Sequence, residues 1–501
     1  MTGPGDGRGR APLPGLLAAA LVFFASGAVL MIEVVGLRLV GPYVGLTLQT
    51  SSAVIGLSLG GIAVGAWAGG RIADQAGSRR LLPIVLVLAG VIICATLPLV
   101  RLVGPSLAAR DPVSITILAF IAVFAPCVFL SSVPPMVVKL QLRDIERTGT
   151  VVGRLSGLGT LGAILATFLT GFVLLAALPT TAIFLGLGGV TILVGLVLGL
   201  TPGGWRRPPA MLVLAGFLAL LLPPLLPGPC AVETAYHCAS VVPDPDRSSG
   251  RYLVMDSLLH SYVDLGDPTY LRFPYIQALA SVSDVIRPAG QPLRALHLGA
   301  GGLTMPRYLA ATRPGTTSRV LEIDPGVIAL DRSQLGMGSI PGLQVDVEDA
   351  RLGLAAEPAG DRDLVIGDAF GGIAVPWQLA TREMMAAIAR TLDAGGVYAA
   401  NVIDYPPGRF IRAEAATVAA VFPDVALVAR PDEISGRTGG NFVLVASAEP
   451  LPLAALQARL DARGSGLTVA SGGVLTRFVG SAEVLTDDHA PVDQLLTTRA
   501  G

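Results

Sequence analysis

The chain has 501 residues, of which 52% are apolar and only 14% are charged, whereas soluble domains carry about 25% charged residues. This composition excludes both a wholly soluble globular chain and a disordered one, and it indicates several membrane helices. The formal net charge of −1 leaves no basic excess, so we expect no nucleic-acid partner.

The charged residues divide the chain into two parts. Residues 1–227 hold 14 Lys and Arg against 6 Asp and Glu, whereas the remaining residues hold 21 against 30. We therefore expect a multi-span transmembrane domain over 1–227 and a soluble domain over 251–501. The segment 228–250 is rich in Pro, Ser and Asp, and this composition predicts a linker.

Apolar runs in the first part are long enough to cross about 30 Å of hydrocarbon at roughly 20 residues each. They predict an all-α bundle of about seven spans in the lipid bilayer of the cell membrane. The first run is too long for a signal peptide and lacks a cleavage site. The runs lie at 14–40, 51–70, 81–103, 113–138, 155–177, 180–200 and 209–227.

The loops between these runs alternate in charge, with eleven Lys and Arg on one side and three on the other. The positive-inside rule places the amino terminus in the cytoplasm, and seven spans then place residues 228–501 outside. A pair formed by Cys230 and Cys238 would agree with an oxidising outside compartment, and two free thiols are the alternative. A re-entrant seventh run, broken by Pro223 and Pro224, would instead return the domain to the cytoplasm. The sequence leaves both sides open.

One carboxylate, Glu33, lies inside the first run. A charge at that depth is costly in free energy, so two roles are open for it. Glu33 either bonds a neighbouring helix or Arg38, or it takes part in substrate or proton binding.

The soluble part alternates short β-rich runs with helix-like segments. We expect an α/β Rossmann-like domain, of the kind seen in S-adenosylmethionine-dependent methyltransferases, with a mostly parallel sheet. A small β-hairpin region over 251–265 precedes it. A strand over 293–298 then runs into Gly299-Ala300-Gly301-Gly302, a turn that lets backbone N–H groups approach a ligand. About twenty residues later a second strand ends at Glu322, where an acid can accept both hydroxyls of a ribose. Together they predict a nucleoside cofactor.

Two further strand ends carry acids. Asp349 is placed to contact the amino group of a base, and Asp368 follows the fourth strand, at the crevice where α/β sheets bind ligands. Asp363, at the start of that strand, has the predicted structural role of a cap.

The order of these motifs resembles the spermidine synthases (polyamine aminopropyltransferases). The resemblance rests on four motifs in this order: the glycine turn, Val-Leu-Glu-Ile-Asp-Pro, Asp-Ala, and an Asp after an apolar strand. Residues 255–260 resemble the family's Leu-Asp-Gly-x-x-Gln strand, and residues 273–277 lie where the family has Tyr-His-Glu. Residues 26–35 and 486–492 are similar to segments of the membrane-fused members.

The resemblance implies a reaction and a set of site residues. An aminopropyl group would pass from decarboxylated S-adenosylmethionine to an amine such as putrescine, without a metal. Adenosylated cofactors are made in the cytoplasm, so this reaction favours the cytoplasmic side for the soluble domain, whereas the loop charges favour the outside. Asp368 would deprotonate the amine with Tyr275 beside it. Glu322 would bind the ribose of the cofactor, and Asp349 and Ala350 would bind its adenine. Gly299 and Gly301 would border its tail, and His260 would contact the cofactor or the amine. By analogy with the soluble members, a homodimer is expected.

Three departures from the family keep other functions open. The glycine turn lacks its acid, Ile276-Gln277 replaces His-Glu, and Gly371 replaces the second Asp of Asp-x-x-Asp-Pro. A polyamine cation needs several carboxylates, so these losses weaken the case for putrescine itself. The alternatives are an S-adenosylmethionine-dependent methyltransferase and a catalytically inactive ligand-binding or transport-linked membrane protein.

Overall fold

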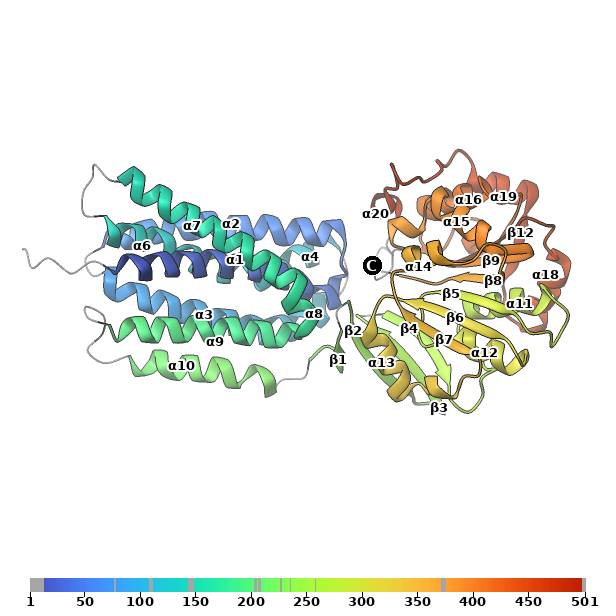
Figure 1. Ribbon diagram of the computed structural model, residues 1–501, viewed down its shortest axis with the longest axis horizontal. Helices are drawn as coiled ribbons and strands as arrows, with labels where there is room; N and C mark the ends of the chain where they lie inside the picture. The colour runs from blue at the N-terminus through green and yellow to red at the C-terminus, as the bar shows by residue number, and fades with distance from the viewer. Residues whose placement is uncertain are drawn as a thin grey trace, which may run out of the picture. The chain divides into compact units, whose positions relative to one another are not determined.

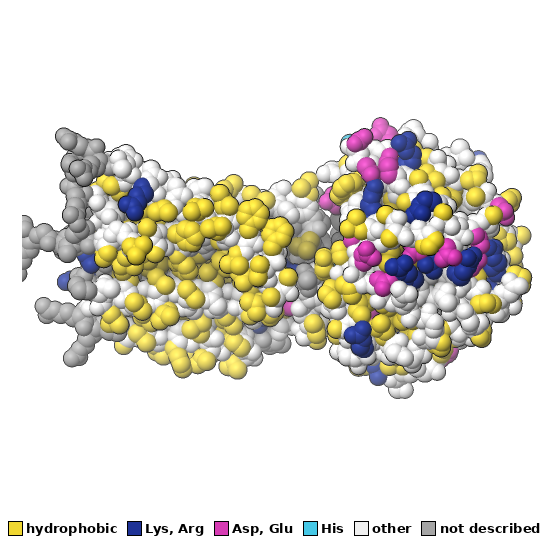
Figure 2. Space-filling view, viewed as in Figure 1, with side chains coloured by type: hydrophobic (Ala, Val, Ile, Leu, Met, Phe, Trp, Pro, Cys, Tyr) yellow, Lys and Arg dark blue, Asp and Glu magenta, His cyan; other side chains and the backbone are white. Residues whose placement is uncertain are grey.

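The computed structural model describes residues 13–75, 78–107, 111–142, 148–201, 205, 209–225, 228–234, 236–256, 258–370 and 375–497. Its contacts divide the chain into two compact units, Met1–Pro229 and Cys230–Gly501. We call the first the helical unit and the second the sheet unit. Figure 2 shows apolar side chains over most of the visible face of the helices, whereas charged side chains gather on the sheet unit.

Within the described residues of the helical unit, six helices are long and apolar enough to cross a membrane. They are α1 (Gly15–Val44), α2 (Leu48–Ala73), α3 (Ser78–Val103), the run α4–α6 (Pro112–Gln141), the run α7–α8 (Thr148–Ala177) and α9 (Thr180–Gly199). Two π-helical turns, Phe120–Phe124 and Thr170–Leu174, interrupt the fourth and fifth of them. The helices lie side by side along a common direction (Figure 1).

Of the about seven spans that the sequence predicts, six are long apolar helices within the described residues, and the seventh is shorter. The seventh apolar run forms the shorter helix α10 (Ala210–Leu221), followed by a 3₁₀ turn at Pro223–Leu225. Proline lacks the N–H that an α-helix needs, so the two prolines end the regular helix early. Glu33 lies within α1 and is partly buried, and its role stays a prediction.

Small residues allow α2 to approach its neighbours closely. A Cβ at Gly65 would lie 2.3 Å from the Val128 carbonyl oxygen, and one at Gly69 would lie 2.4 Å from that of Ser132. These glycines face α5 (Ala125–Ser131) and α6 (Val133–Gln141). Close backbone approach of this kind strengthens van der Waals packing between membrane helices.

The sheet unit is built on a mixed sheet of eight strands in the order β12-β10-β11-β9-β8-β5-β6-β7. The pairs within β9-β8-β5-β6-β7 are parallel, and the pairs that add β11, β10 and β12 are antiparallel. The α/β fold is thus as predicted, with an antiparallel edge that the sequence did not reveal. The strands are β5 (Arg294–Leu298), β6 (Thr317–Glu322), β7 (Leu343–Val347), β8 (Arg362–Gly367), β9 (Leu392–Asp404), β10 (Asp424–Ala429), β11 (Gly440–Ser447) and β12 (Thr468–Ser471).

Helices cover both faces of this sheet (Figure 1). Alternate strand residues point to opposite faces, so Val365 packs in one apolar cluster and Leu364 in the other. One face is covered by α14 (Ala350–Ala356), α15 (Arg382–Thr391), α16 (Arg409–Ala419) and α19 (Gly472–Val479). The other is covered by α11 (Pro274–Val285), α12 (Thr304–Thr312) and α18 (Leu453–Ala462).

A second, four-stranded antiparallel sheet precedes the large one. It has the order β1-β2-β3-β4, with β1 (Val232–Glu233), β2 (Cys238–Asp244), β3 (Arg247–Met255) and β4 (Leu258–Asp264). The predicted hairpin is therefore present, but the predicted linker over 228–250 is wrong. Its polar composition is typical of a loop, yet β2 and the start of β3 form an antiparallel hairpin there. Cys230 and Cys238 form a disulfide across the start of this sheet.

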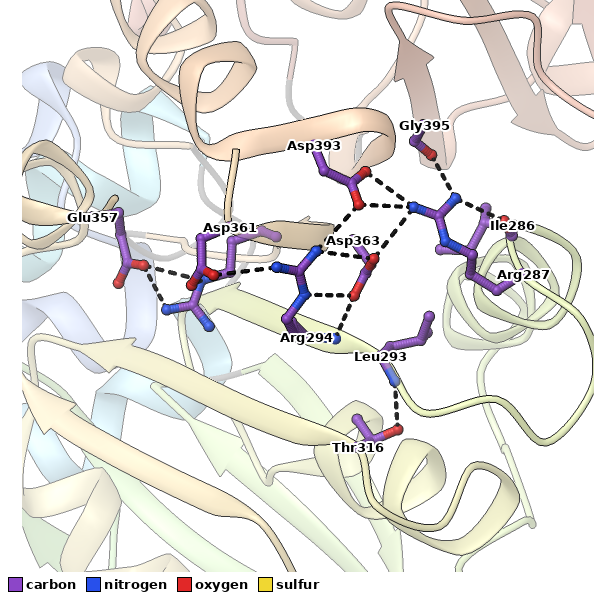
Figure 3. Close-up of polar contacts among 11 residues, drawn as sticks. Ile286, Arg287, Leu293, Arg294, Thr316, Glu357, Asp361, Asp363, Asp393 and Gly395 are labelled. Atoms are coloured by element: carbon purple, nitrogen blue, oxygen red, sulfur yellow. Dashed lines mark hydrogen bonds and ion pairs between the residues drawn. The ribbon is translucent and has the colours of Figure 1, made fainter. Parts of the chain in front are cut away.

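A cluster of ion pairs joins the amino ends of three parallel strands. Asp363 of β8 accepts hydrogen bonds from the backbone N–H of Arg294 at 2.8 Å, from its side chain, and from Arg287. Both arginines also reach Asp393 of β9 (Figure 3). Although burial alone would raise the pKa of Asp363, the bonds from Arg294 lower it. Asp363 thus has the structural role that the sequence predicts.

Replacing Asp363 by Leu should lower the free energy of unfolding by about 3 kcal/mol, because partly buried Arg294 and Arg287 lose one of the two carboxylates that they share. Thermal unfolding of the detergent-purified chain measures the change. The control is Arg437→Ala, which breaks an exposed pair with Asp432 and should cost less than about 1 kcal/mol. Equal losses in the two variants would refute the structural role of Asp363.

Candidate active site

A cavity of about 320 Å³ lies at the carboxyl ends of the parallel strands. This is the edge at which α/β sheets bind ligands. All eight residues predicted from the sequence line it: His260, Tyr275, Gly299, Gly301, Glu322, Asp349, Ala350 and Asp368. Residues of β4, α11, β5, β6, β8, β9 and β11, or of the loops that follow them, thus meet around one space.

The glycine turn after β5 is shaped by close backbone contacts. Gly299 has φ +97°, and a Cβ there would lie 2.6 Å from the carbonyl oxygen of Asp368. Gly301 has φ +48°, and a Cβ there would meet the Ser261 hydroxyl at 2.6 Å. Only glycine adopts such angles without strain and without filling the space. The turn therefore brings the strand ends of β5 and β8 together and leaves room above them.

Glu322, the last residue of β6, is fixed by two backbone donors. One carboxylate oxygen accepts the N–H of Ala300 at 2.8 Å, and the other accepts the N–H of Asp324 at 2.9 Å. Burial raises the pKa of Glu322, and these two hydrogen bonds oppose that rise. Each oxygen keeps a second lone pair, so the carboxylate can still accept a pair of hydroxyl groups.

Asp349 lies beyond β7 and caps helix α14. One carboxylate oxygen accepts the backbone N–H groups of Arg351 at 2.9 Å and Leu352 at 3.1 Å. Such caps satisfy the free donors of a first helical turn. The other carboxylate oxygen of Asp349 makes neither of these bonds. Asp349 and the next residue, Ala350, both line the cavity.

Asp368 follows β8 and is oriented by two amides in series. The Asn401 side chain donates to one Asp368 carboxylate oxygen at 2.9 Å. The Asn401 carbonyl oxygen in turn accepts from the Asn441 amide at 2.9 Å. Burial raises the pKa of Asp368 to about 6, and the bond from Asn401 opposes this rise. A carboxylate with a pKa near neutrality is suited to accept a proton.

Tyr275, on the first turn of α11, donates a hydrogen bond from its hydroxyl to the His260 carbonyl oxygen at 3.1 Å. Burial and the nearby Asp368 charge raise the pKa of Tyr275 well above its ordinary value. Tyr275 is therefore a neutral phenol that borders the same space as Asp368.

The sequence analysis missed several residues that also line the cavity. Asn401, Asn441 and Tyr405 come from β9, β11 and the residue after β9, and His237 precedes β2. His237 contacts the Asp256 carboxylate through Nδ1 at 3.0 Å. Burial lowers the pKa of His237, but the Asp256 hydrogen bond and the charges of Asp256, Asp324 and Glu322 together outweigh it, so the net shift is upward. No sequence pattern marks these residues, because strands far apart along the chain bring them together.

Two other expectations concern the limits of the site. Gly371 and Gly372, where the family's second acid is missing, lie outside the described residues. Among the residues that the structure describes, no group of three or more His, Cys, Asp and Glu side chains is arranged to hold a metal ion.

Comparison with known proteins identifies one curated relative. The polyamine aminopropyltransferase of Vibrio vulnificus is 30% identical over 201 residues, which are 39% of this chain and 64% of the relative. No family model matches the chain. The sequence match confirms the resemblance to the polyamine aminopropyltransferases, over part of the relative's length.

Solved spermidine synthases are also similar to the chain. A probable spermidine synthase from Corynebacterium glutamicum shares 27% identity at a TM-score of 0.48, covering 51% of this chain and 95% of its own. The Thermotoga maritima enzyme shares 18% identity at a TM-score of 0.36, covering 53% and 83%. Both scores lie below 0.5, so the relationship depends on the sequence match.

Proposed function

We propose that this chain, given its similarity to the polyamine aminopropyltransferases, is a membrane-anchored enzyme that transfers an aminopropyl group from decarboxylated S-adenosylmethionine to an amine. The observation that carries the proposal is the meeting of Glu322, Asp349 and Asp368 in one cavity. They come from three different strand ends, and each would contact a different part of the two reactants.

Glu322 would accept the two ribose hydroxyls, for which its oxygens keep free lone pairs. Asp349 and Ala350 would contact the adenine, with the free Asp349 oxygen accepting from the amino group of the base. The small residues Gly299 and Gly301 would leave room for the tail that carries the sulfonium. His260 and His237 border the cavity from the small sheet.

Asp368 would take the proton of the acceptor amine. The freed nitrogen lone pair forms a bond to the aminopropyl carbon, and the electrons of the carbon–sulfur bond return to sulfur. The sulfonium thereby becomes the neutral thioether of methylthioadenosine, and the proton on Asp368 passes to solvent. Tyr275, as a neutral phenol, would help to orient the amine. Proton removal by a placed base typically contributes about 10²- to 10⁴-fold to a rate.

Product analysis tests this proposal. Detergent-purified chain is incubated with decarboxylated or ordinary S-adenosylmethionine and a panel of amines. Release of methylthioadenosine supports aminopropyl transfer. Release of S-adenosylhomocysteine would instead identify a methyltransferase, and release of neither would leave a catalytically inactive ligand-binding protein.

We also propose that the sheet unit lies on the extracytoplasmic side of the membrane. The two ends of the seventh apolar segment are hydrogen-bonded to the two ends of α3. Trp205, before α10, donates to the Arg80 carbonyl oxygen at 3.3 Å, and Arg101 donates to the Pro223 carbonyl oxygen at 3.1 Å. From Arg80 to Arg101 an α-helix rises roughly 30 Å, about the thickness of the hydrocarbon core. The short helix and its flanks thus match a complete crossing rather than a re-entrant loop.

Two further observations support this side. The eleven basic loop residues favour a cytoplasmic amino terminus, and an odd number of crossings leaves the chain outside. The disulfide between Cys230 and Cys238 follows directly, and disulfides persist in oxidising compartments. An outside site requires that the adenosyl co-substrate reach that side.

Labelling with a membrane-impermeant maleimide tests the side. Cys94 and Cys127 are buried in the helical unit, so background labelling is low. With the cytoplasmic membrane intact, Arg437→Cys in the sheet unit should be labelled. The control Asp74→Cys, at the basic-loop end of α2, should react only after permeabilisation. Labelling of both sites only after permeabilisation would place the sheet unit in the cytoplasm.

A further inference from the structure

The carboxylates that line the cavity are unevenly distributed over the sheet. Glu322 and Asp349 follow β6 and β7, whereas Asp368 follows β8. Beyond β8 the sheet continues with β9 and β11. With neighbouring strands about 4.8 Å apart, Glu322 lies about three strand spacings, roughly 14 Å, from β9.

The lining residues of β9 and β11 and of the turn after β9 are Asn401, Ile403, Tyr405 and Asn441. We call these four the β9–β11 wall. The wall holds two amides, one phenol and one aliphatic side chain, and no carboxylate. The undescribed segment 371–374 is Gly-Gly-Ile-Ala, so its sequence adds no acid either.

The hydrogen-bonding capacity of the wall is partly used. Asn401 gives its amide N–H to Asp368 and accepts from Asn441 through its oxygen. Two neutral acceptors, the Asn441 oxygen and the Tyr405 hydroxyl, are left for a ligand. A second ammonium group placed here would lose its hydration without meeting an opposite charge, which is costly in a confined site.

Nearby acids outside the cavity do not supply this charge. Asp404 is fully buried, and its oxygens accept the backbone N–H groups of Tyr405, Ile411 and Thr497. Glu433 accepts the N–H of Arg430. Burial raises the pKa of both carboxyl groups. Neither lines the cavity.

We infer, on the basis of the proposed function, that the acceptor is an amine with a single positive charge. Its reacting nitrogen meets Asp368, and its distal end, neutral and polar or apolar, lies along the β9–β11 wall. The second charge of a diamine of the same length would have no partner there.

A length-matched pair of acceptors tests the inference on the full chain with decarboxylated S-adenosylmethionine. We compare kcat/KM for 4-amino-1-butanol and 1,4-diaminobutane, which differ only in the group at the far end. The expected value is at least about tenfold higher for the amino alcohol, since an unpartnered charge costs about this much or more. A preference for the diamine would overturn the inference while supporting the proposed function. If neither acceptor supports release of methylthioadenosine, both the inference and the proposed function are overturned.

A charge added to the wall provides the second test. Ile403→Glu places a carboxylate beside the distal end of the acceptor, and Ile403→Gln has nearly the same size without the charge. The Glu variant should raise the diamine-to-amino-alcohol ratio of kcat/KM by about tenfold, as an added ion pair in a confined site can. The Gln variant should leave the ratio unchanged. Equal ratios in the two variants would overturn the inference, and thermal unfolding of both verifies that they fold.

Discussion

Replacing Asp368 by Asn should reduce aminopropyl transfer by about 10²- to 10⁴-fold, the usual contribution of a general base. Asparagine retains the size of the side chain but cannot accept the proton of the amine. Binding of methylthioadenosine should change little, because the proposed adenosine contacts lie at Glu322, Asp349 and Ala350. Single-turnover product formation measures the first quantity, and calorimetric titration measures the second.

The pH dependence of kcat/KM for the wild type should reflect the ionisation of Asp368. Burial raises the pKa of Asp368 to about 6, and only the ionised carboxylate can act as the base. The value of kcat/KM should therefore be high above pH 6 and fall as the pH drops through it. Asn401→Ala removes a hydrogen bond that favours the ionised form, so it should shift this fall to higher pH. Full turnover by Asp368→Asn would reject Asp368 as the base.

Replacing Glu322 by Gln should weaken the binding of methylthioadenosine by about 100-fold, because two charge-assisted hydrogen bonds to ribose are lost or reduced. The change also disturbs the turn. Both Glu322 oxygens accept backbone N–H groups, from Ala300 and Asp324, so one N–H would face the amide nitrogen of glutamine. Calorimetric titration of the detergent-purified chain measures the affinity.

The matched control for this prediction is Asp346→Asn. Asp346 is an acid on the neighbouring strand β7, where it pairs with Arg319 at 2.7 Å and does not line the cavity. Its replacement should leave the affinity within about twofold, since it touches no proposed ligand group. Equal weakening by both variants would mean that Glu322 acts on stability rather than on the ligand.

The sequence predicts well which strand-end residues meet at this cavity, and the reason is topological. Parallel strands joined by helices bring their carboxyl ends to one edge, so an acid or a glycine turn at the end of an apolar run has a predictable position. Gly299, Glu322, Asp349 and Asp368 all follow this rule and line one cavity. Tyr275 and His260, which no periodicity indicates, came from the resemblance to a family.

The residues on the β9–β11 side of the cavity could not be predicted in this way. Asn401 and Asn441 become neighbours only because β11 pairs antiparallel with β9, and that pairing depends on contacts distant in sequence. The strands in the expected linker were missed for a different reason: they pair with neighbours along the chain, but their Pro, Ser and Asp content is typical of a linker. The break at Pro223 and Pro224 is visible in the sequence, but the sequence leaves open whether the seventh run crosses the membrane.

A structure of the full chain in detergent with bound methylthioadenosine tests the central claim most directly. The account predicts the ribose hydroxyls within hydrogen-bond distance of Glu322, the adenine beside Asp349 and Ala350, and the thioether directed toward Asp368. A nucleoside bound away from these three carboxylates would contradict it.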